Sequence, residues 1–262
     1  MGEMKRLDGK TALITGSSSG FGRAIAIGYA KEGARIVCAD LKKSASKDEA
    51  FEPDTDTDDY IRKTSGEAIF AETDVRDVDQ VKNAVDQAVK TFGTLDIMVN
   101  NAGVFTKIGA THELDQHDWD FTMDVTAKGM YNGCQQAIIQ FLKQGGGVIV
   151  NICSIGGVVG LKGETAYCAA KEAVYNMTRA IALDYAKQNI RVNGICPNYS
   201  ATPMSIFGYK TPEIKSAIEA ATPMGRWMEI REIVGPAVFL ASNESSYITG
   251  HNLVVDGGYT IG

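Results

Sequence analysis

The chain has 262 residues, of which 44% are hydrophobic, and carries 26 Lys and Arg against 32 Asp and Glu, a formal net charge of -6. This length and composition suit one α/β domain with a single large core. The acidic balance, without any basic block, argues against a nucleic-acid partner. No apolar run approaches the ~20 residues that span a bilayer. The first residues, Met1 to Asp8, lack the apolar stretch of a secretory signal, so we expect a cytoplasmic location without membrane association.

The cysteines and histidines do not form a metal or disulfide pattern. The five cysteines are scattered without a Cys-x-x-Cys pair, which is typical of small buried residues in a reducing compartment. The three histidines lie far from metal-ligand spacing, so we expect no metal site. The acidic run Asp54 to Asp59 is similar to half of a calcium loop, but Asp59 stands where that loop needs Gly and Ser65 where it needs Glu. We therefore expect an acidic surface insertion there.

Short β-rich runs alternate with longer helical patterns along the chain. Runs such as Val148 to Val150 are apolar at consecutive positions, which suits a parallel strand covered on both faces. The alternation predicts one domain over residues 1–262, a doubly wound parallel sheet of about seven strands with helices on both faces. The expected strands are Thr11–Thr15, Arg35–Ala39, Ala68–Glu72, Asp96–Asn100, Gly147–Ile152, Arg191–Ile195 and Asn252–Val255. The expected helices lie near 22–32, 78–92, 118–143, 163–187 and 229–241.

A glycine-rich turn follows the first expected strand and opens directly into a helical run. Glycines there let the backbone approach a pyrophosphate, and the helix N-terminus offers unpaired N–H groups to its charge. The spacing from Gly16 to Gly22 is Gly-x-x-x-Gly-x-Gly, which differs from the commoner Gly-x-Gly-x-x-Gly. Asp40 ends the second strand, where a carboxylate accepts hydrogen bonds from an adenosine ribose and repels a 2′-phosphate. Together these features predict a dinucleotide site that prefers NAD.

Tyr167 and Lys171 are four residues apart in an Ala-rich helical segment, so their side chains stack on one helical face. We expect the ammonium to stabilise the phenolate and lower the Tyr167 pKa toward the range useful for proton transfer. Ser154 stands thirteen residues upstream at the end of an apolar run and offers a hydroxyl to a substrate oxygen. These three residues are the candidate catalytic group.

In the order and spacing of these elements, the chain resembles the short-chain dehydrogenase/reductase family, in its NAD(H)-using branch, over nearly its whole length. The resemblance is carried by Thr15–Gly22, Asp40, Asp74 and Val75, Asn100–Gly103, the Ser154, Tyr167 and Lys171 group, and Pro197–Thr202. It implies a Rossmann-type fold and NAD as the cofactor. The cofactor-binding residues it implies are Gly16, Ser18, Ser19, Gly20, Phe21, Gly22, Asp40, Leu41, Asp74, Val75, Asn101, Ala102, Gly103, Tyr167, Lys171, Pro197, Ser200 and Thr202.

The same resemblance implies the reaction. Tyr167 takes and returns the alcohol proton, Ser154 holds the substrate oxygen, and Lys171 supplies charge and bonds the nicotinamide ribose. The segment 203–224 is expected to form a flap over the substrate. The family commonly forms homotetramers, and small alanines on the Tyr167 helix suit close helix packing.

Two departures from the family pattern bear on the site. Many relatives carry an Asn that feeds a proton relay where this chain has Thr126; we expect the Thr126 hydroxyl to order a water there. Relatives usually have Pro-Gly where this chain has Pro197-Asn198. Because Asn tolerates a left-handed φ, we expect that turn to persist with the Asn198 side chain projecting near the nicotinamide.

The expected function is NAD-dependent interconversion of a secondary alcohol and its ketone, with a small hydroxylated metabolite as substrate. Two alternatives stay open. One is a reductase of carrier-bound 3-oxoacyl groups, against which Asp40 and the acidic balance count. The other is an NAD-binding sensor or structural protein without catalysis, against which the intact Ser154, Tyr167 and Lys171 group counts.

Overall fold

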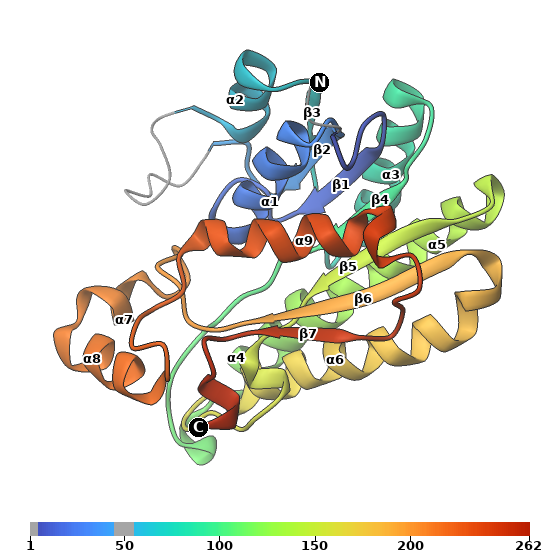
Figure 1. The fold of residues 1–262 in the computed structure, drawn as a ribbon. Helices are drawn as coiled ribbons and strands as arrows, with labels where there is room; N and C mark the ends of the chain where they lie inside the picture. Colours follow the sequence, from blue (N-terminus) through green and yellow to red (C-terminus); the bar gives the residue numbers. More distant parts are fainter. Residues whose placement is uncertain (1–4, 45–54) are drawn as a thin grey trace.

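The computed structural model describes residues 5–44 and 55–262. Seven strands form one parallel sheet in the order β3-β2-β1-β4-β5-β6-β7 (Figure 1). The strands are β1 (Thr11–Thr15), β2 (Arg35–Asp40), β3 (Ala68–Glu72), β4 (Ile97–Asn100), β5 (Gly147–Ile152), β6 (Ile190–Pro197) and β7 (Asn252–Val255). The seven strands expected from the sequence are confirmed, because consecutive apolar residues are buried on both faces of a parallel sheet.

Helices cover both faces of the sheet, as the doubly wound prediction required. They are α1 (Gly20–Lys31), α2 (Thr57–Thr64), α3 (Val78–Phe92), α4 (Gln116–Thr122), α5 (Gly129–Gln144), α6 (Thr165–Tyr185), α7 (Ile206–Lys210), α8 (Pro212–Ala221) and α9 (Val234–Ala241). Helices α1, α2 and α9 supply residues to one buried core, and α3, α5 and α6 to the other (Figure 1). No helix within the described ranges is both long enough and apolar enough to cross a bilayer.

Several helical boundaries differ from the sequence-based expectation. The helix expected over 118–143 is divided into α4, a π-helical turn (Met123–Lys128) and α5. The helix expected over 229–241 begins with a 3-10 turn (Ile230–Ile233) before α9. Helices α2, α7 and α8 were not expected, and the last two lie inside the segment 203–224, beside the main body of the fold (Figure 1).

The expected acidic surface insertion is wrong at Thr57 and Asp58, which are buried, whereas Asp56 and Asp59 are partly exposed. Asp54 lies outside the described residues. Asp58 belongs to α2 and is only 2% exposed. Its carboxylate pairs with Arg62 at 2.8 Å and Lys43 at 3.2 Å. A buried carboxylate is tolerated when it is paired in this way. The neighbouring Thr57 hydroxyl donates to the Ser17 carbonyl at 2.8 Å, so α2 is attached to the glycine-rich turn.

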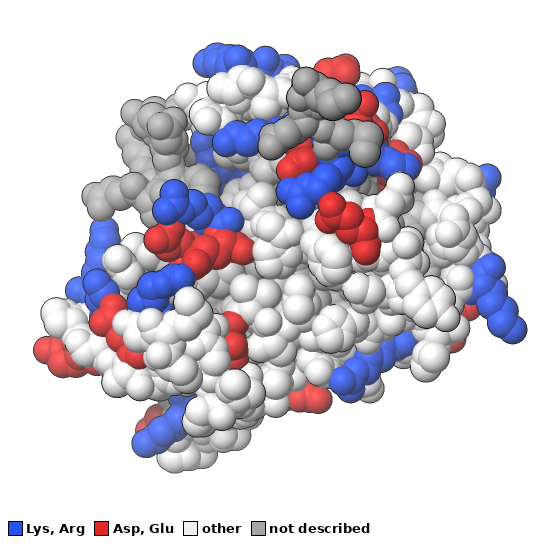
Figure 2. All heavy atoms as spheres, in the orientation of Figure 1, with Lys and Arg blue, Asp and Glu red and all other residues white. Residues whose placement is uncertain are grey.

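The surface carries charges of both signs close together. Figure 2 shows Lys and Arg interspersed with Asp and Glu around a largely uncharged centre on the face that it draws. Exposed pairs elsewhere in the chain include Arg226 with Glu232 at 2.7 Å and Lys82 with Asp86 at 2.5 Å. Pairs of this kind contribute only about 0–1 kcal/mol each, less than the burial of a single large apolar side chain in the core.

Candidate active site

The site begins where the strand order reverses, between β1 and β4. In such sheets, ligands bind beyond the carboxyl ends of the strands at this switch point. The loops that follow the two strands are joined by hydrogen bonds. The backbone N–H groups of Asn101 and Ala102 donate to the Thr15 hydroxyl at 3.0 and 3.1 Å. The Asn101 amide also donates to the Thr15 carbonyl at 2.9 Å and the Gly16 carbonyl at 3.1 Å. The two loops are therefore held in one fixed arrangement.

The glycine-rich turn packs closely against neighbouring loops at the N-terminus of α1. Gly16 and Gly20 have φ of 64° and 51°, a region that favours glycine. A Cβ on Gly22 would lie 2.1 Å from the Gly16 carbonyl oxygen, and one on Gly20 would lie 3.4 Å from Thr202. Ser19 is the N-cap residue of α1, but its side chain accepts no hydrogen bond from the helix. The first backbone N–H groups of the helix therefore point into the turn without a bond from the Ser19 side chain. This arrangement suits a pyrophosphate.

Asp40 ends β2 beside this turn, as expected. Its carboxylate accepts hydrogen bonds from the backbone N–H groups of Ser18 at 2.9 Å and Leu41 at 2.7 Å. The Ser18 hydroxyl donates to the Lys42 carbonyl at 2.7 Å, which holds the chain after β2 against the turn. Because a carboxylate has about four lone-pair sites, the Asp40 oxygens can still accept hydroxyl donors.

The cations near Asp40 have other partners. Lys43 lies 3.2 Å from both Asp58 and Asp59, and these hydrogen bonds raise its pKa. Arg35 begins β2 at the opposite end of the strand, where it donates to the Gly9 carbonyl at 2.8 Å. Lys42 is exposed. Unlike Lys43, Lys42 forms no ion pair with a residue in the described part of the chain.

Asp74 and Val75 follow β3, whose last residue, Glu72, is in register with Asp40. The Asp74 carboxylate pairs with Arg76 at 2.6 Å, and this hydrogen bond lowers the Asp74 pKa. Val75 is buried. These implied cofactor-binding residues therefore lie one strand beyond Asp40 at the same edge of the sheet.

Ser154, Tyr167 and Lys171 come together at the carboxyl end of β5. Ser154 follows that strand, and its hydroxyl accepts from the Gly156 N–H at 3.1 Å. The Lys171 ammonium lies 5.7 Å from the centre of the Tyr167 ring and donates to the Ile152 carbonyl at 2.8 Å. The candidate catalytic residues expected from the sequence thus share one place in the fold.

The protonation equilibria differ from the expectation. Burial raises the pKa of Tyr167 to about 12, although a hydrogen bond with Ser154 opposes the rise. Burial also lowers the pKa of Lys171 to about 8. The expectation that Lys171 lowers the Tyr167 pKa is wrong for this arrangement, because the ammonium is directed to the Ile152 carbonyl and desolvation outweighs its effect.

The π-helical turn brings Thr126 to the same place. Thr126 is fully buried, and its hydroxyl accepts from the Val104 N–H at 3.2 Å. A Cβ on Gly103 would lie 3.5 Å from both the Thr126 hydroxyl and the Lys171 ammonium. Such π-helical turns are frequent at functional sites. The Thr126 hydroxyl and the Lys171 ammonium are therefore both close to Gly103.

The loop after β6 differs from the expectation at Asn198. Among the described residues, only Asn189 has a positive φ outside glycine, so Asn198 is not left-handed. Its side-chain amide donates to the Thr222 hydroxyl at 3.2 Å and to the Asp256 carbonyl at 2.9 Å. The expected projection toward the nicotinamide is wrong, because these bonds direct the side chain toward the C-terminal segment. Within the same loop, Ser200 is buried and forms a bridge to Met228.

Sequence reasoning missed a polar pair next to the catalytic group. The Tyr199 hydroxyl donates to Glu164 Oε1 at 2.8 Å. Glu164 stands three residues before Tyr167, and this closeness in the sequence was a usable signal. Tyr199 carried no such signal, because the pair forms only when the loop after β6 meets the start of α6.

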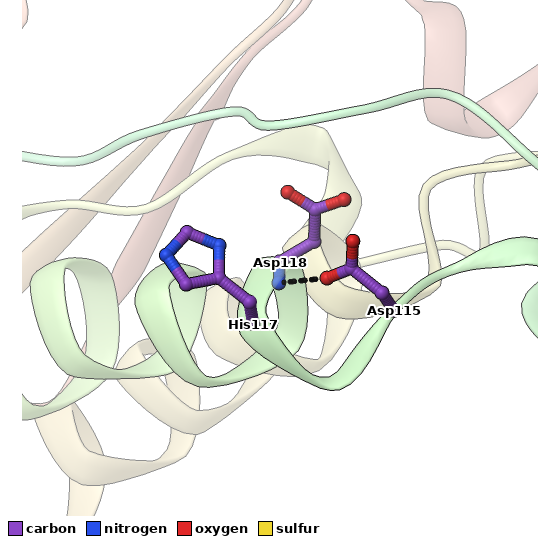
Figure 3. Close-up of side chains that lie close together, drawn as sticks. All are labelled: Asp115, His117 and Asp118. Carbon is purple, nitrogen blue, oxygen red and sulfur yellow. Dashed lines mark hydrogen bonds between the residues drawn. The ribbon is translucent and has the colours of Figure 1, made fainter.

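Two groups of side chains among the described residues are close enough to hold a cation. In the first, Asp115, His117 and Asp118 surround the start of α4 (Figure 3). Asp115 accepts from the Asp118 N–H at 2.8 Å as the helix cap, and the His117 ring stacks on Phe121. Capping accounts for this arrangement. The second group, in and beside α2, already contains the Asp58 ion pairs.

Comparison with known proteins relates this geometry to a family. A family model described as "Enoyl-(Acyl carrier protein) reductase" matches residues 16–260. The 3-oxoacyl-[acyl-carrier-protein] reductase FabG of Thermotoga maritima is 36% identical, over 98% of this chain and all of that protein. The D-threitol dehydrogenase of Mycolicibacterium smegmatis is 38% identical, over 98% of this chain and 95% of that one.

Solved structures of dehydrogenases have the same fold as this chain. Carveol dehydrogenase from Mycobacterium avium in complex with NAD superposes with a TM-score of 0.90 at 30% identity, covering 98% of this chain and 100% of that one. A gluconate 5-dehydrogenase from Burkholderia cenocepacia in complex with NADP and tartrate has a TM-score of 0.90 at 33% identity, covering 99% and 98%. With the sheet order, the glycine-rich turn and the Ser154, Tyr167 and Lys171 group described above, these matches assign the chain to the short-chain dehydrogenase/reductase family of oxidoreductases.

Proposed function

We propose that this protein is an NAD-dependent oxidoreductase that interconverts a secondary alcohol and its ketone by hydride transfer. The observation that carries the proposal is the meeting of Ser154, Tyr167 and Lys171 at the sheet edge that also holds the glycine-rich turn and Asp40. A proton-transfer group beside a dinucleotide cradle is the arrangement that hydride transfer to or from a carbonyl requires.

The residues present fit a nicotinamide dinucleotide. Gly16 and Gly22 allow the turn to pack against the loop after β4, the α1 N-terminus faces the turn, and Asp40 lies beside it to accept the ribose hydroxyls. Asp74 and Val75 are proposed to border the adenine, and Asn101 to Gly103 with Pro197 to Thr202 to line the remainder. When bound, the nicotinamide ring supplies the hydride acceptor or donor.

The side chains of the site then divide the remaining work. During oxidation, the deprotonated Tyr167 takes the proton of the alcohol; during reduction, the phenol returns it. Ser154 donates a hydrogen bond to the substrate oxygen and orients it. Lys171 places a buried ammonium group 5.7 Å from the centre of the Tyr167 ring. General acid–base catalysis of this kind contributes about 10²–10⁴-fold to the rate.

The proposal is tested by following NADH formation with a panel of sugars, polyols, hydroxy acids, steroids and cyclic alcohols. Oxidation of at least one secondary alcohol supports it. A protein that binds NAD but oxidises no member of the panel, and reduces none of the corresponding ketones, would contradict it.

Cofactor preference is a separate prediction that rests on Asp40. Each charge-assisted bond to a ribose hydroxyl contributes about 1.5–3 kcal/mol, whereas a 2′-phosphate meets the same carboxylate as a repulsive charge. Because Lys43 is held by Asp58 and Asp59, it offers little compensation. We expect NAD to be preferred by at least ~10-fold in kcat/KM, for which 1.4 kcal/mol suffices.

The Asp40→Ala variant should narrow this preference. Glu72→Ala provides the matched control, because it removes a carboxylate from the end of the neighbouring strand without touching the turn. Steady-state kinetics with NAD and with NADP give the ratio of the two kcat/KM values for each variant. Equal or higher wild-type efficiency with NADP would overturn the NAD assignment.

A third prediction concerns Thr126. If its hydroxyl holds a water that relays protons from Lys171, Thr126→Val should lower kcat, while Thr126→Asn should retain or raise it. Thr126→Ser is the control, because it keeps both the hydroxyl and the bond to the Val104 N–H. Unchanged kcat in the Val and Asn variants would show that the relay does not use this position.

A second candidate function, reduction of carrier-bound 3-oxoacyl groups, is supported by the family description and by the Thermotoga maritima relative. Asp40 counts against it to the extent that such reduction uses NADPH. Assay of a 3-oxoacyl thioester with NADPH and NADH separates the two functions.

Three further parts of the proposal concern the whole molecule. The segment 203–224 is proposed as a substrate flap, which its exposed apolar residues Met204 and Phe207 support. A homotetramer and a cytoplasmic location are proposed by analogy with the family. Light scattering on the purified protein tests the assembly.

A further inference from the structure

A buried carboxyl group lies beside the candidate proton donor. Glu164 immediately precedes α6 and stands three residues before Tyr167. Glu164 is the N-cap residue of α6, with φ of -118° and ψ of 35°, so it lies just outside the helical turn that carries Tyr167. The two groups interact electrostatically, since the Glu164 charge contributes to raising the Tyr167 pKa. Glu164 is only 8% exposed.

Only one oxygen of the Glu164 carboxyl group accepts a hydrogen bond from a described residue. Oε1 accepts the hydrogen bond from the Tyr199 hydroxyl at 2.8 Å. Among the described residues nothing donates to Oε2, and this atom is not sealed from solvent. Because solvent reaches this oxygen, water satisfies it when no ligand is bound. Oε2 is therefore available to a ligand.

The surroundings hold this carboxyl group rigidly. Tyr199 packs against Trp227 and Tyr259, with ring centres 5.7 and 6.2 Å apart. On the other side, the Gly109 N–H donates to the Gly163 carbonyl at 3.0 Å, which attaches the loop after β4 next to Glu164. Three segments far apart in sequence thus fix one acceptor near the reacting hydroxyl, as preorganised recognition requires.

We propose that Glu164 is a specificity-determining residue whose Oε2 accepts a hydrogen bond from a second hydroxyl of the substrate, so that diols and polyols are the preferred alcohols. This inference rests on the proposed function, because it names the substrate class of the same reaction.

The test compares matched alcohols that differ by one hydroxyl, 2-butanol with 2,3-butanediol and cyclohexanol with cyclohexane-1,2-diol. Sites built to bond a substrate hydroxyl strongly disfavour analogues that lack it. We expect the wild type to prefer the diols by at least ~10-fold in kcat/KM. Glu164→Leu should remove most of that preference while leaving the mono-alcohols within about 3-fold, less than 1 kcal/mol. Glu164→Gln, which keeps an acceptor for Tyr199, should retain most of it.

Glu172→Gln is the matched control, because Glu172 is exposed on the same helix, and its ratio should equal that of the wild type. Thermal unfolding and cofactor binding verify the fold, and Glu164→Ala replaces the Leu variant if that variant unfolds. Equal wild-type efficiency with both members of each pair, or equal losses for both in the Leu variant, would overturn the inference. The inference would also be overturned if Glu164→Gln lost activity only toward amino alcohols, because that result would indicate that Glu164 recognises a cation. A wild type that oxidises none of the four alcohols and none of the wider panel contradicts the proposed function instead.

Discussion

Tyr167→Phe is expected to lower turnover by ~10²-fold or more, the scale of general acid–base catalysis, while cofactor binding stays nearly unchanged. The substitution removes only the hydroxyl that exchanges a proton with the substrate. The ring and its edge-to-face contact with Phe105, 5.4 Å between centres, are kept. Initial rates with saturating cofactor measure the loss, and the fluorescence of bound NADH measures affinity.

The matched control is Tyr175→Phe, which removes a hydroxyl two turns further along α6, where Tyr175 accepts a bond from Arg179. It should turn over like the wild type.

The wild-type efficiency of oxidation should also rise with pH, because burial holds the Tyr167 pKa near 12 and the reacting form is the phenolate. A Phe variant with wild-type turnover would show that another group carries the proton.

The second large effect is expected for Gly22→Ala. A Cβ at this position would lie 2.1 Å from the Gly16 carbonyl oxygen and 2.5 Å from the Asn101 amide nitrogen. Neither can move without disturbing the bonds that join the loops after β1 and β4. Overpacking of this kind costs about 1–3 kcal/mol, so we expect a lower Tm and cofactor affinity weakened by at least ~10-fold.

Calorimetric titration with NAD and a thermal melt check both effects. Gly235→Ala serves as the control: Gly235 lies in α9 with nothing within 4 Å of its added Cβ, so this variant should be neutral or slightly more stable. Wild-type cofactor affinity in Gly22→Ala would contradict the assignment of this turn to the pyrophosphate.

The sequence by itself determined the seven parallel strands of the sheet and indicated the candidate catalytic residues. Apolar runs such as Val148 to Val150 specify buried parallel strands, because no other element buries consecutive residues on both sides over so short a length. The glycines after β1 and the i, i+4 spacing of Tyr167 and Lys171 could also be interpreted from the sequence. The conformation of a glycine turn and the face of a helix are set by neighbouring residues and need no distant contact.

The tertiary structure decided what depends on contacts between distant segments. The burial of Asp58 requires Lys43 and Arg62 to be brought to it. The direction of Asn198 is set by Thr222 and Asp256, which its own φ preference could not reveal.

The protonation of the catalytic group was also a tertiary property. The sign of the Tyr167 pKa shift depends on desolvation by the assembled sheet and helices, which outweighs a charge that spacing alone would place beside it. The bond between Tyr199 and Glu164 joins residues 35 positions apart. Because such contacts form only when the loops after different strands meet at one edge, no local pattern in the chain encodes them.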